Sequence, residues 1–163
     1  MGPEDVNPLE SRTPQPEDLA DLCRSLNEQG ARYLVVGGFA MIQHGLNRTT
    51  DDIDILLEPS AENQKRVLKA LEYLPDKAVR EVQENDLNEF LVVRVADEIV
   101  VDLMLKTCGI DFITAEAFIE WHEYRGVRIP FASPSMMLKM KQTYREKDAL
   151  DRQFLHSKLQ NKL

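Results

Sequence analysis

Two aspartates at the start of an apolar run are the residues of this chain best suited to chemistry. Asp52 and Asp54 flank Ile53 in the run DIDILL. Residues two apart in a β-strand point to the same face, so the two carboxylates lie side by side while Ile53 faces the core. Adjacent carboxylates repel, and hard cations that prefer oxygen ligands, typically Mg²⁺, stabilise them. The spacing therefore predicts a metal site.

A third aspartate can complete that site. Asp102 interrupts the core-like run VVDLM, where a charge is costly to bury unless it is paired or metal-bound. Residues 89–105 read as two β-rich runs around Ala96–Glu98, which predicts an antiparallel hairpin. If the strand carrying Asp102 lies beside the strand carrying Asp52 and Asp54, the three carboxylates can hold one or two metal ions, about 3.5 to 4 Å apart in two-metal sites.

A glycine pair provides the complementary half of the site. Gly37-Gly38 follows the apolar run of residues 33–36 and precedes FAMIQHG, a predicted short helix. Glycines let backbone N–H groups approach a phosphate closely, and a helix N-terminus adds a favourable dipole. Either the glycine pair or the Asp-x-Asp alone is weak evidence, because an ordinary tight turn is the favoured explanation of the glycine pair by itself. Together with Asp102 they indicate a metal-bound nucleoside triphosphate.

The elements around these residues predict an α/β fold with a mixed sheet flanked by helices and a helical C-terminal end. Apolar spacing of three and four, with helix caps at Ser60 and Ser133, indicates the helices, and short β-rich runs indicate the strands. The predicted helices cover residues 16–29, 39–45, 61–74, 114–122, 135–147 and 147–159, the last two with little or no break, and the predicted strands and hairpins cover 33–36, 52–57, 89–105 and 124–131.

Composition sets the wider limits. We expect residues 1–15, which are acidic and proline-rich, to form a flexible arm, and residues 16–163 to form a single domain. The net charge of −8 argues against a broad nucleic-acid-binding surface. No apolar run is long enough to span a membrane or to form a signal peptide. Cys23 and Cys108 share no metal spacing, which predicts free thiols and a cytoplasmic location.

The motifs Val36-Gly37-Gly38, Asp52-Ile53-Asp54 and Val101-Asp102-Leu103 resemble those of the nucleotidyltransferase superfamily with the DNA polymerase beta-like fold. The stretch GGFAMIQHGLNRTTDDIDILL looks like that of minimal nucleotidyltransferases, which include abortive-infection-type toxins and small antibiotic-modifying enzymes. The tail from Lys141 to Asp151 resembles the Lys-x-x-x-Arg-x-Lys-Asp-x-x-Asp helix frequent in that group. The likeness covers about residues 31–155. It departs from the adenylyltransferases that carry Gly-Ser, and the chain has no large substrate domain.

The resemblance implies a role for each matching acid and glycine. Asp52 and Asp54 would ligate two Mg²⁺ ions. Asp102 would bind the catalytic metal and act as general base toward an acceptor hydroxyl. Gly37 and Gly38 would hold the triphosphate.

Four basic or polar positions complete the predicted nucleotide site. Arg48 and Thr49 precede the acidic pair and are expected to contact phosphate, with an ordinary loop role as the alternative. Lys141 and Arg145 lie four apart, so on one helix they would share a face that reaches the triphosphate. A solvated helix face is the alternative for that pair.

These residues predict a Mg²⁺-dependent nucleotidyltransferase that transfers a nucleoside monophosphate from an NTP to an acceptor hydroxyl on a tRNA end, a protein or a small molecule. One alternative is a catalytically silent nucleotide-binding or interaction module, such as a toxin–antitoxin component with a protein partner. Another is a phosphatase that uses Asp-x-Asp. That chemistry favours an apolar strand leading into the first aspartate, whereas residues 48–51 are polar, and it leaves the glycine pair unexplained.

Overall fold

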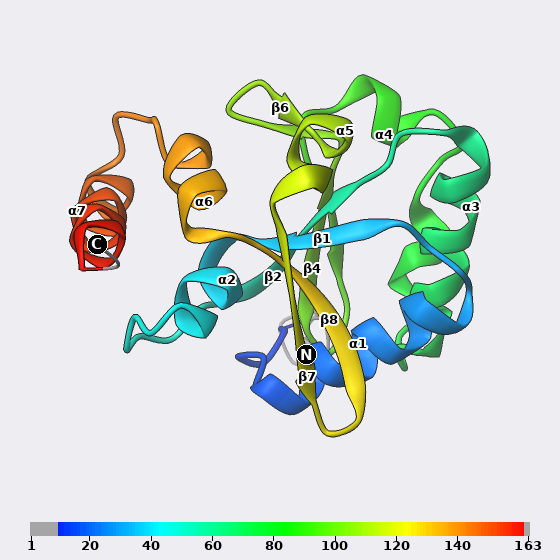
Figure 1. Ribbon diagram of the computed structural model, residues 1–163. Coiled ribbons are helices and arrows are strands. Elements are labelled where there is room, and N and C mark those ends of the chain that lie inside the picture. The colour runs from blue at the N-terminus through cyan, green and yellow to red at the C-terminus, as the bar shows by residue number, and fades with distance from the viewer. Residues whose placement is uncertain (1–9, 162–163) are drawn as a thin grey trace, which may run out of the picture.

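The computed structural model describes residues 10–161 and contains a six-stranded mixed sheet (Figure 1). The strand order is β3-β4-β2-β1-β8-β7, in which β2 pairs with β4 and β1 with β8 in parallel, and the other neighbours are antiparallel. A separate hairpin joins β5 to β6. The strands are β1 Tyr33–Val36, β2 Asp52–Leu57, β3 Val93–Ala96, β4 Val100–Met104, β5 Lys106–Thr107, β6 Ile110–Asp111, β7 Ile119–Tyr124 and β8 Val127–Ala132.

Helices lie on both sides of these strands, which confirms the predicted α/β class (Figure 1). Helices α1 and α3 contact each other on one side, whereas α2 contacts α6, and α6 contacts α7, on the other. The α-helices are α1 Pro16–Glu28, α2 Gly37–Gln43, α3 Ala61–Ala70, α4 Asp86–Glu89, α5 Phe112–Ala115, α6 Pro134–Met140 and α7 Glu146–Gln160. Short 3-10 helices cover Leu71–Tyr73, Ala78–Glu81 and Glu116–Phe118. Within the described residues, no helix has the length and apolar character needed to cross a membrane.

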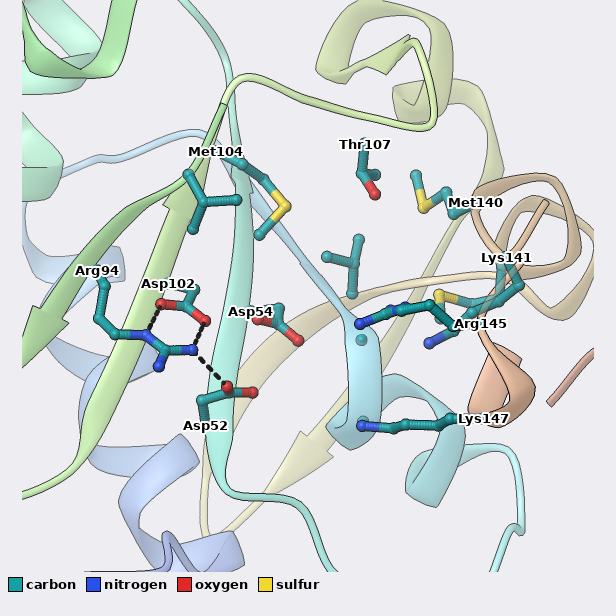
Figure 2. Close-up of a pocket in the computed structure, with 15 residues that line it drawn as sticks. Asp52, Asp54, Arg94, Asp102, Met104, Thr107, Met140, Lys141, Arg145 and Lys147 are labelled. Carbon is teal, nitrogen blue, oxygen red and sulfur yellow. Dashed lines mark hydrogen bonds and ion pairs between the residues drawn. The ribbon is translucent and has the colours of Figure 1, made fainter. Parts of the chain in front are cut away.

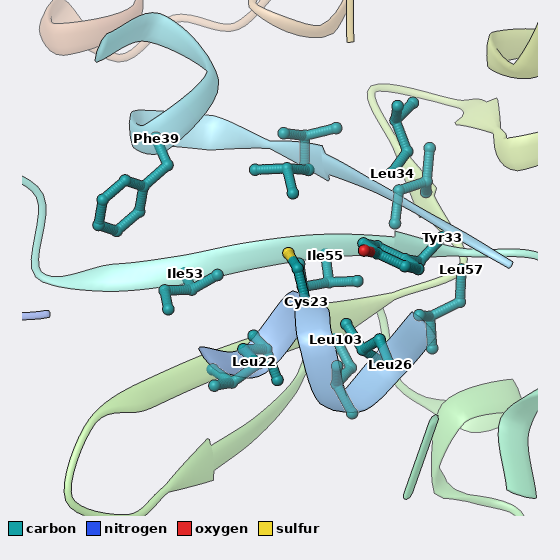
Figure 3. Packing of buried hydrophobic residues seen from close by; sticks show 14 of the residues in the cluster. Leu22, Cys23, Leu26, Tyr33, Leu34, Phe39, Ile53, Ile55, Leu57 and Leu103 are labelled. Atoms are coloured by element: carbon teal, nitrogen blue, oxygen red, sulfur yellow. The ribbon is translucent and has the colours of Figure 1, made fainter. Parts of the chain in front are cut away.

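The packing of the core explains which face of β2 carries Asp52 and Asp54. Ile53 and Ile55 are fully buried, and Figure 3 shows them close to Leu22 and Cys23 of α1. Alternation along the strand then turns Asp52 and Asp54 to the opposite face. Burial of the isoleucine side chains, at about 1.5–3 kcal/mol each, fixes the face on which the acids lie.

Two local predictions are wrong. The helix predicted over 114–122 ends at Phe118, and Ile119–Tyr124 forms β7, which pairs with β8 through a turn at Arg125-Gly126. The continuous C-terminal helix is also interrupted. Helix α6 ends at Met140 and α7 begins at Glu146, because side-chain hydrogen bonds from Arg152 satisfy the carbonyls of Lys141 and Thr143 that a helix would use internally.

The two predicted N-caps are confirmed, whereas α2 begins at Gly37, two residues before the predicted start, and β3 begins at Val93 rather than at residue 89. Ser60 and Ser133 accept hydrogen bonds from the backbone N–H groups three residues later, as N-caps do. The β5–β6 hairpin and the short helices of residues 78–89 had no counterpart in the prediction. Of the predicted arm, residues 1–9 lie outside the described residues, and Ser11 and Arg12 hydrogen-bond to the β3–β4 turn at residues 97–98.

Candidate active site

The three predicted carboxylates converge on one face of two neighbouring strands. Strands β2 and β4 run parallel with Asp54 opposite Asp102, and Asp52 lies two residues earlier on the same face of β2. One oxygen from each side chain lies within 4.8 Å of the other two. Asp102 is buried, whereas Asp52 and Asp54 are half-buried (Figure 2). Three oxygen donors at this spacing form a set that a hard divalent cation can occupy.

The glycine pair brings the β1–α2 turn against this cluster. Gly37 has φ +69°, and a Cβ there would lie 2.7 Å from the Asp54 carboxyl carbon. At Gly38 a Cβ would lie 2.6 Å from the Thr50 Cβ. Both positions therefore exclude a side chain because the chain itself packs against them. The sequence suggested phosphate approach or a tight turn for the glycine pair, and the structure adds this packing requirement.

The cluster carries unusual electrostatics. Burial, followed by the charges of Asp52 and Asp102, raises the pKa of Asp54 to about 7. Burial and the charge of Asp102 also raise the pKa of Asp52, which the nearby Arg94 opposes. The negative charges are thus only partly compensated by the protein. A bound cation would relieve this repulsion, so the residues fit a divalent metal ion.

Like Lys147, Arg94 is one of the site residues that sequence reasoning missed. Its Nε donates to Asp102 Oδ1 at 2.9 Å, and its Nη2 donates to Asp102 Oδ2 at 2.9 Å and to Asp52 Oδ2 at 3.1 Å (Figure 2). In the β3–β4 hairpin Ala96 pairs with Val100, so Arg94 pairs with Asp102. Counting outward from the predicted turn at residues 96–98 would place Arg94 opposite Val100. The turn instead covers residues 97–99, and this shift of the register brings Arg94 opposite Asp102.

Basic side chains line the other side of the cleft. Lys141, Arg145 and Lys147 come from the α6–α7 connection and the start of α7, and Figure 2 shows them opposite the carboxylates. Lys141 and Arg145 do not share a helix face as predicted, because Lys141 is the C-cap of α6 and Arg145 the N-cap of α7. The loop nevertheless brings both to the cleft.

Two buried carboxylates hold this basic wall in place. Lys141 Nζ lies 3.3 Å from Asp148 Oδ1 and 3.1 Å from Asp151 Oδ2. Asp148 also accepts hydrogen bonds from Thr143 Oγ1 at 2.5 Å and from Arg145 Nε at 2.9 Å. Against the effect of burial, the contacts with Thr143, Arg145 and Lys141 lower the pKa of Asp148. The Arg145–Asp148 pair is thus part of a larger network that includes Lys141 and Asp151.

Arg48 and Thr49 do not line the cleft. Arg48 Nη1 lies 3.0 Å from Asp151 Oδ1, and Thr49 is exposed. The buried Asp151 charge needs a partner, which explains why Arg48 turns toward α7. Among the predicted site residues, the structure therefore brings together Gly37, Gly38, Asp52, Asp54, Asp102 and Lys141.

The cleft between the two walls has a volume of about 280 Å³. Its remaining lining is largely apolar, from Val92, Met104, Met137 and Met140. Met137 and Met140 are also buried in the core. The cleft therefore offers an acidic wall, a basic wall and an apolar part within one space.

No protein-family model and no curated protein matches the sequence. Solved structures do resemble the fold. The lincosamide antibiotic adenylyltransferase LnuA, solved with lincomycin bound, is 19% identical with a TM-score of 0.62, over 90% of this chain and 99% of that one. A Thermotoga maritima protein described as a “putative nucleotidyltransferase” is 18% identical with a TM-score of 0.54, over 90% and 92%. The chain has the nucleotidyltransferase fold.

Proposed function

We propose that the protein is a metal-dependent nucleotidyltransferase, which transfers a nucleoside monophosphate from an NTP to an acceptor hydroxyl. The observation that carries the proposal is the convergence of Asp52, Asp54 and Asp102 opposite a wall of cations in one cleft. An acidic wall suits metal ions, and a basic wall suits the triphosphate that the ions accompany. The fold shared with LnuA supports the same chemistry.

Asp52, Asp54 and Asp102 would hold one or two Mg²⁺ ions. Bound there, Mg²⁺ would neutralise charge on the phosphoryl group during transfer. Gly37 and Gly38 would present backbone N–H groups to the triphosphate, and Lys141, Arg145 and Lys147 would contribute positive charge from the other wall. Arg48 would act through the Asp151 carboxylate that it shares with Lys141, and Thr49 would have no direct contact.

The transfer step uses Asp102 as general base. Its carboxylate would take the proton from the acceptor hydroxyl, and the resulting oxygen would attack the α-phosphorus in line. The bond from the α-phosphorus to its bridging oxygen would break, and pyrophosphate would leave with that electron pair. No covalent enzyme intermediate is required.

Two observations favour a small molecule as acceptor. The apolar side chains of Val92 and Met104 line the cleft beside the carboxylates and suit an acceptor with an apolar body. The neighbour LnuA is named for the adenylylation of lincosamide antibiotics. A tRNA end or a protein hydroxyl is the competing acceptor. The free thiols of Cys23 and Cys108 support a cytoplasmic setting for the reaction.

The experiment is incubation of the protein with each α-³²P-labelled NTP, Mg²⁺ and three acceptor pools: small molecules, RNA and protein from a cell extract. We expect label on one pool together with pyrophosphate release. Asp54→Asn should reduce both by at least about 100-fold, while Glu62→Gln, on the exposed face of α3, should not. Absence of label and of pyrophosphate with all four NTPs would overturn the proposal.

A second candidate is the catalytically silent nucleotide-binding or interaction module, for example one component of a toxin–antitoxin pair. It is favoured by Arg94, which satisfies both oxygens of Asp102 without a metal. In that case Asp52→Asn and Asp54→Asn would leave the biological effect of the protein in cells unchanged. Loss of that effect in both variants would exclude this candidate.

A further inference from the structure

Arg94 lies where a cation that bridges two of the carboxylates would be placed. Its Nη2 is 2.9 Å from Asp102 Oδ2 and 3.1 Å from Asp52 Oδ2, and its Nε is 2.9 Å from Asp102 Oδ1. Figure 2 shows the guanidinium between the two acids. One side chain thus uses both oxygens of Asp102 in the bidentate arrangement that gives the strongest arginine–carboxylate pairs.

Metal coordination and this arrangement exclude each other. Mg²⁺ lies about 2.0–2.1 Å from its oxygen ligands and requires near-octahedral geometry. An ion coordinated by the oxygens that Nη2 now bridges would contact or closely approach a second positive charge. We propose that Arg94 competes with the metal for Asp52 and Asp102, and that this competition sets the metal affinity of the site. The inference rests on the metal site of the proposed function.

The surroundings of Arg94 allow its side chain to move away from Asp52 and Asp102. Arg94 lies on β3, one of the two edge strands of the six-stranded sheet, and its side chain is 59% exposed. Within the described residues its side-chain hydrogen bonds go only to Asp102 and Asp52. Rotation into solvent would therefore cost no other polar contact. The exchange is a local side-chain movement, because β3 stays paired with β4 through backbone hydrogen bonds.

The Asp54 carboxylate, unlike those of Asp52 and Asp102, is not paired with Arg94. No hydrogen bond or ion pair to its carboxylate is formed by the side chains of residues 10–161, and it lies beside the other two acids. Asp54 would therefore be available to a metal ion while Arg94 still pairs with Asp52 and Asp102.

The test is a Mn²⁺ titration of the full chain without nucleotide, followed by the electron paramagnetic resonance signal of free Mn²⁺. Arg94→Gln removes the competing charge and the bidentate contact, so we expect it to bind Mn²⁺ about tenfold more tightly than the wild type. Arg94→Lys keeps the charge and loses the bidentate contact, so its affinity should fall between the two. Arg66→Gln is the matched control, because Arg66 pairs with Glu62 in an exposed helical pair, and it should bind as the wild type does.

The Mn²⁺ binding that Asp54→Asn removes is the part that occurs at the three carboxylates. Only this part is compared between the wild type and the Arg94 variants. Equal or weaker Mn²⁺ binding by both Arg94 variants would overturn the inference. If Arg94→Gln does not fold, Arg94→Lys carries the comparison alone, and tighter binding than the wild type supports the inference. Failure of the proposed function gives a different result: Arg94→Gln would bind Mn²⁺ more tightly while no protein, wild type or variant, transferred label from any NTP.

Discussion

Gly37 is where backbone conformation and site chemistry depend on each other most directly. Its φ of +69° lies in the left-handed region, and a side chain there would overlap the Asp54 carboxylate. Gly37→Ala should therefore lower the free energy of unfolding by more than the about 1–2 kcal/mol that a left-handed alanine costs. It should also weaken Mn²⁺ binding, because Asp54 must move. Urea denaturation and Mn²⁺ titration measure the two effects.

Gly30 is the matched control for that prediction. It has the same φ of +69°, but a Cβ there would meet nothing within 4 Å. Gly30→Ala should carry only the left-handed cost, with Mn²⁺ binding unchanged. If the two alanine variants lost equal stability and both bound Mn²⁺ normally, the close approach of Gly37 to Asp54 would have no energetic consequence.

Asp54 predicts a pH dependence of metal binding centred near neutrality. Its pKa is raised to about 7, so the carboxylate is protonated below that pH and cannot coordinate a cation. The apparent affinity for Mg²⁺ should fall as pH decreases from 8 to 6, measured by isothermal titration calorimetry. Asp54→Asn should bind weakly at every pH without this inflection. A flat profile in the wild type would contradict the assigned pKa.

For the metal-free protein, the raised pKa of Asp54 predicts that folding stability decreases as the pH rises. The folded pKa of Asp54 lies above its unfolded value, so between about pH 4 and 7 the folded state binds more protons than the unfolded state. Its contribution to stability is complete below the unfolded pKa and is lost as the pH rises through about 7. Chemical denaturation in the presence of EDTA should show this loss, and Asp54→Asn should reduce it.

At the scale of elements, α7 acts mainly through the charges in its first turns. Asp151 is buried and contacts both Arg48 and Lys141. It therefore joins α7 to the segment that leads into β2 and to the α6–α7 connection. Asp151→Asn would leave two cations short of a buried partner and should destabilise the protein by about 3–5 kcal/mol. The KM for NTP should rise, because Lys141 loses an anchor. Thermal unfolding and steady-state kinetics would measure both effects.

Glu62→Gln is the control, since Glu62 forms an exposed pair with Arg66 that contributes at most about 1 kcal/mol. Equal stability of the Asp151 and Glu62 variants would mean that the network around α7 does not hold the basic wall. A stability loss with unchanged KM would restrict Asp151 to a structural role.

At the scale of the whole molecule, metal binding should stabilise the entire domain. The three carboxylates lie on strands in the middle of one sheet, so relief of their repulsion acts on the folded state as a unit. A metal at 100 times its Kd contributes about 2.7 kcal/mol. For a chain of this size that corresponds to a rise in Tm of about 5–10 °C. Differential scanning fluorimetry with Mg²⁺, and its reversal by EDTA, tests this expectation, and Asp102→Asn should respond less.

The sequence by itself determined the local elements and the chemistry of the acids. Strands β1 and β2 have the predicted bounds, because each is a short apolar run ended by glycine or polar residues. Alternation around Ile53 placed Asp52 and Asp54 on one face. The hairpin that carries Asp102 also followed from its two β-rich runs. These features depend on neighbouring residues along the chain, so their signals are complete within a few positions.

Tertiary structure decided which residues distant in sequence meet at the cleft. The sequence did not place β4 beside β2, and this pairing sets Asp102 opposite Asp54. Arg48 turned to Asp151 instead of the cleft, and the helix predicted through Lys141 was broken by side chains of α7. Buried charges choose partners that are distant in sequence, because desolvation makes an unpaired charge costly wherever the chain places it. Spacing along the chain carries no information about which partner that will be.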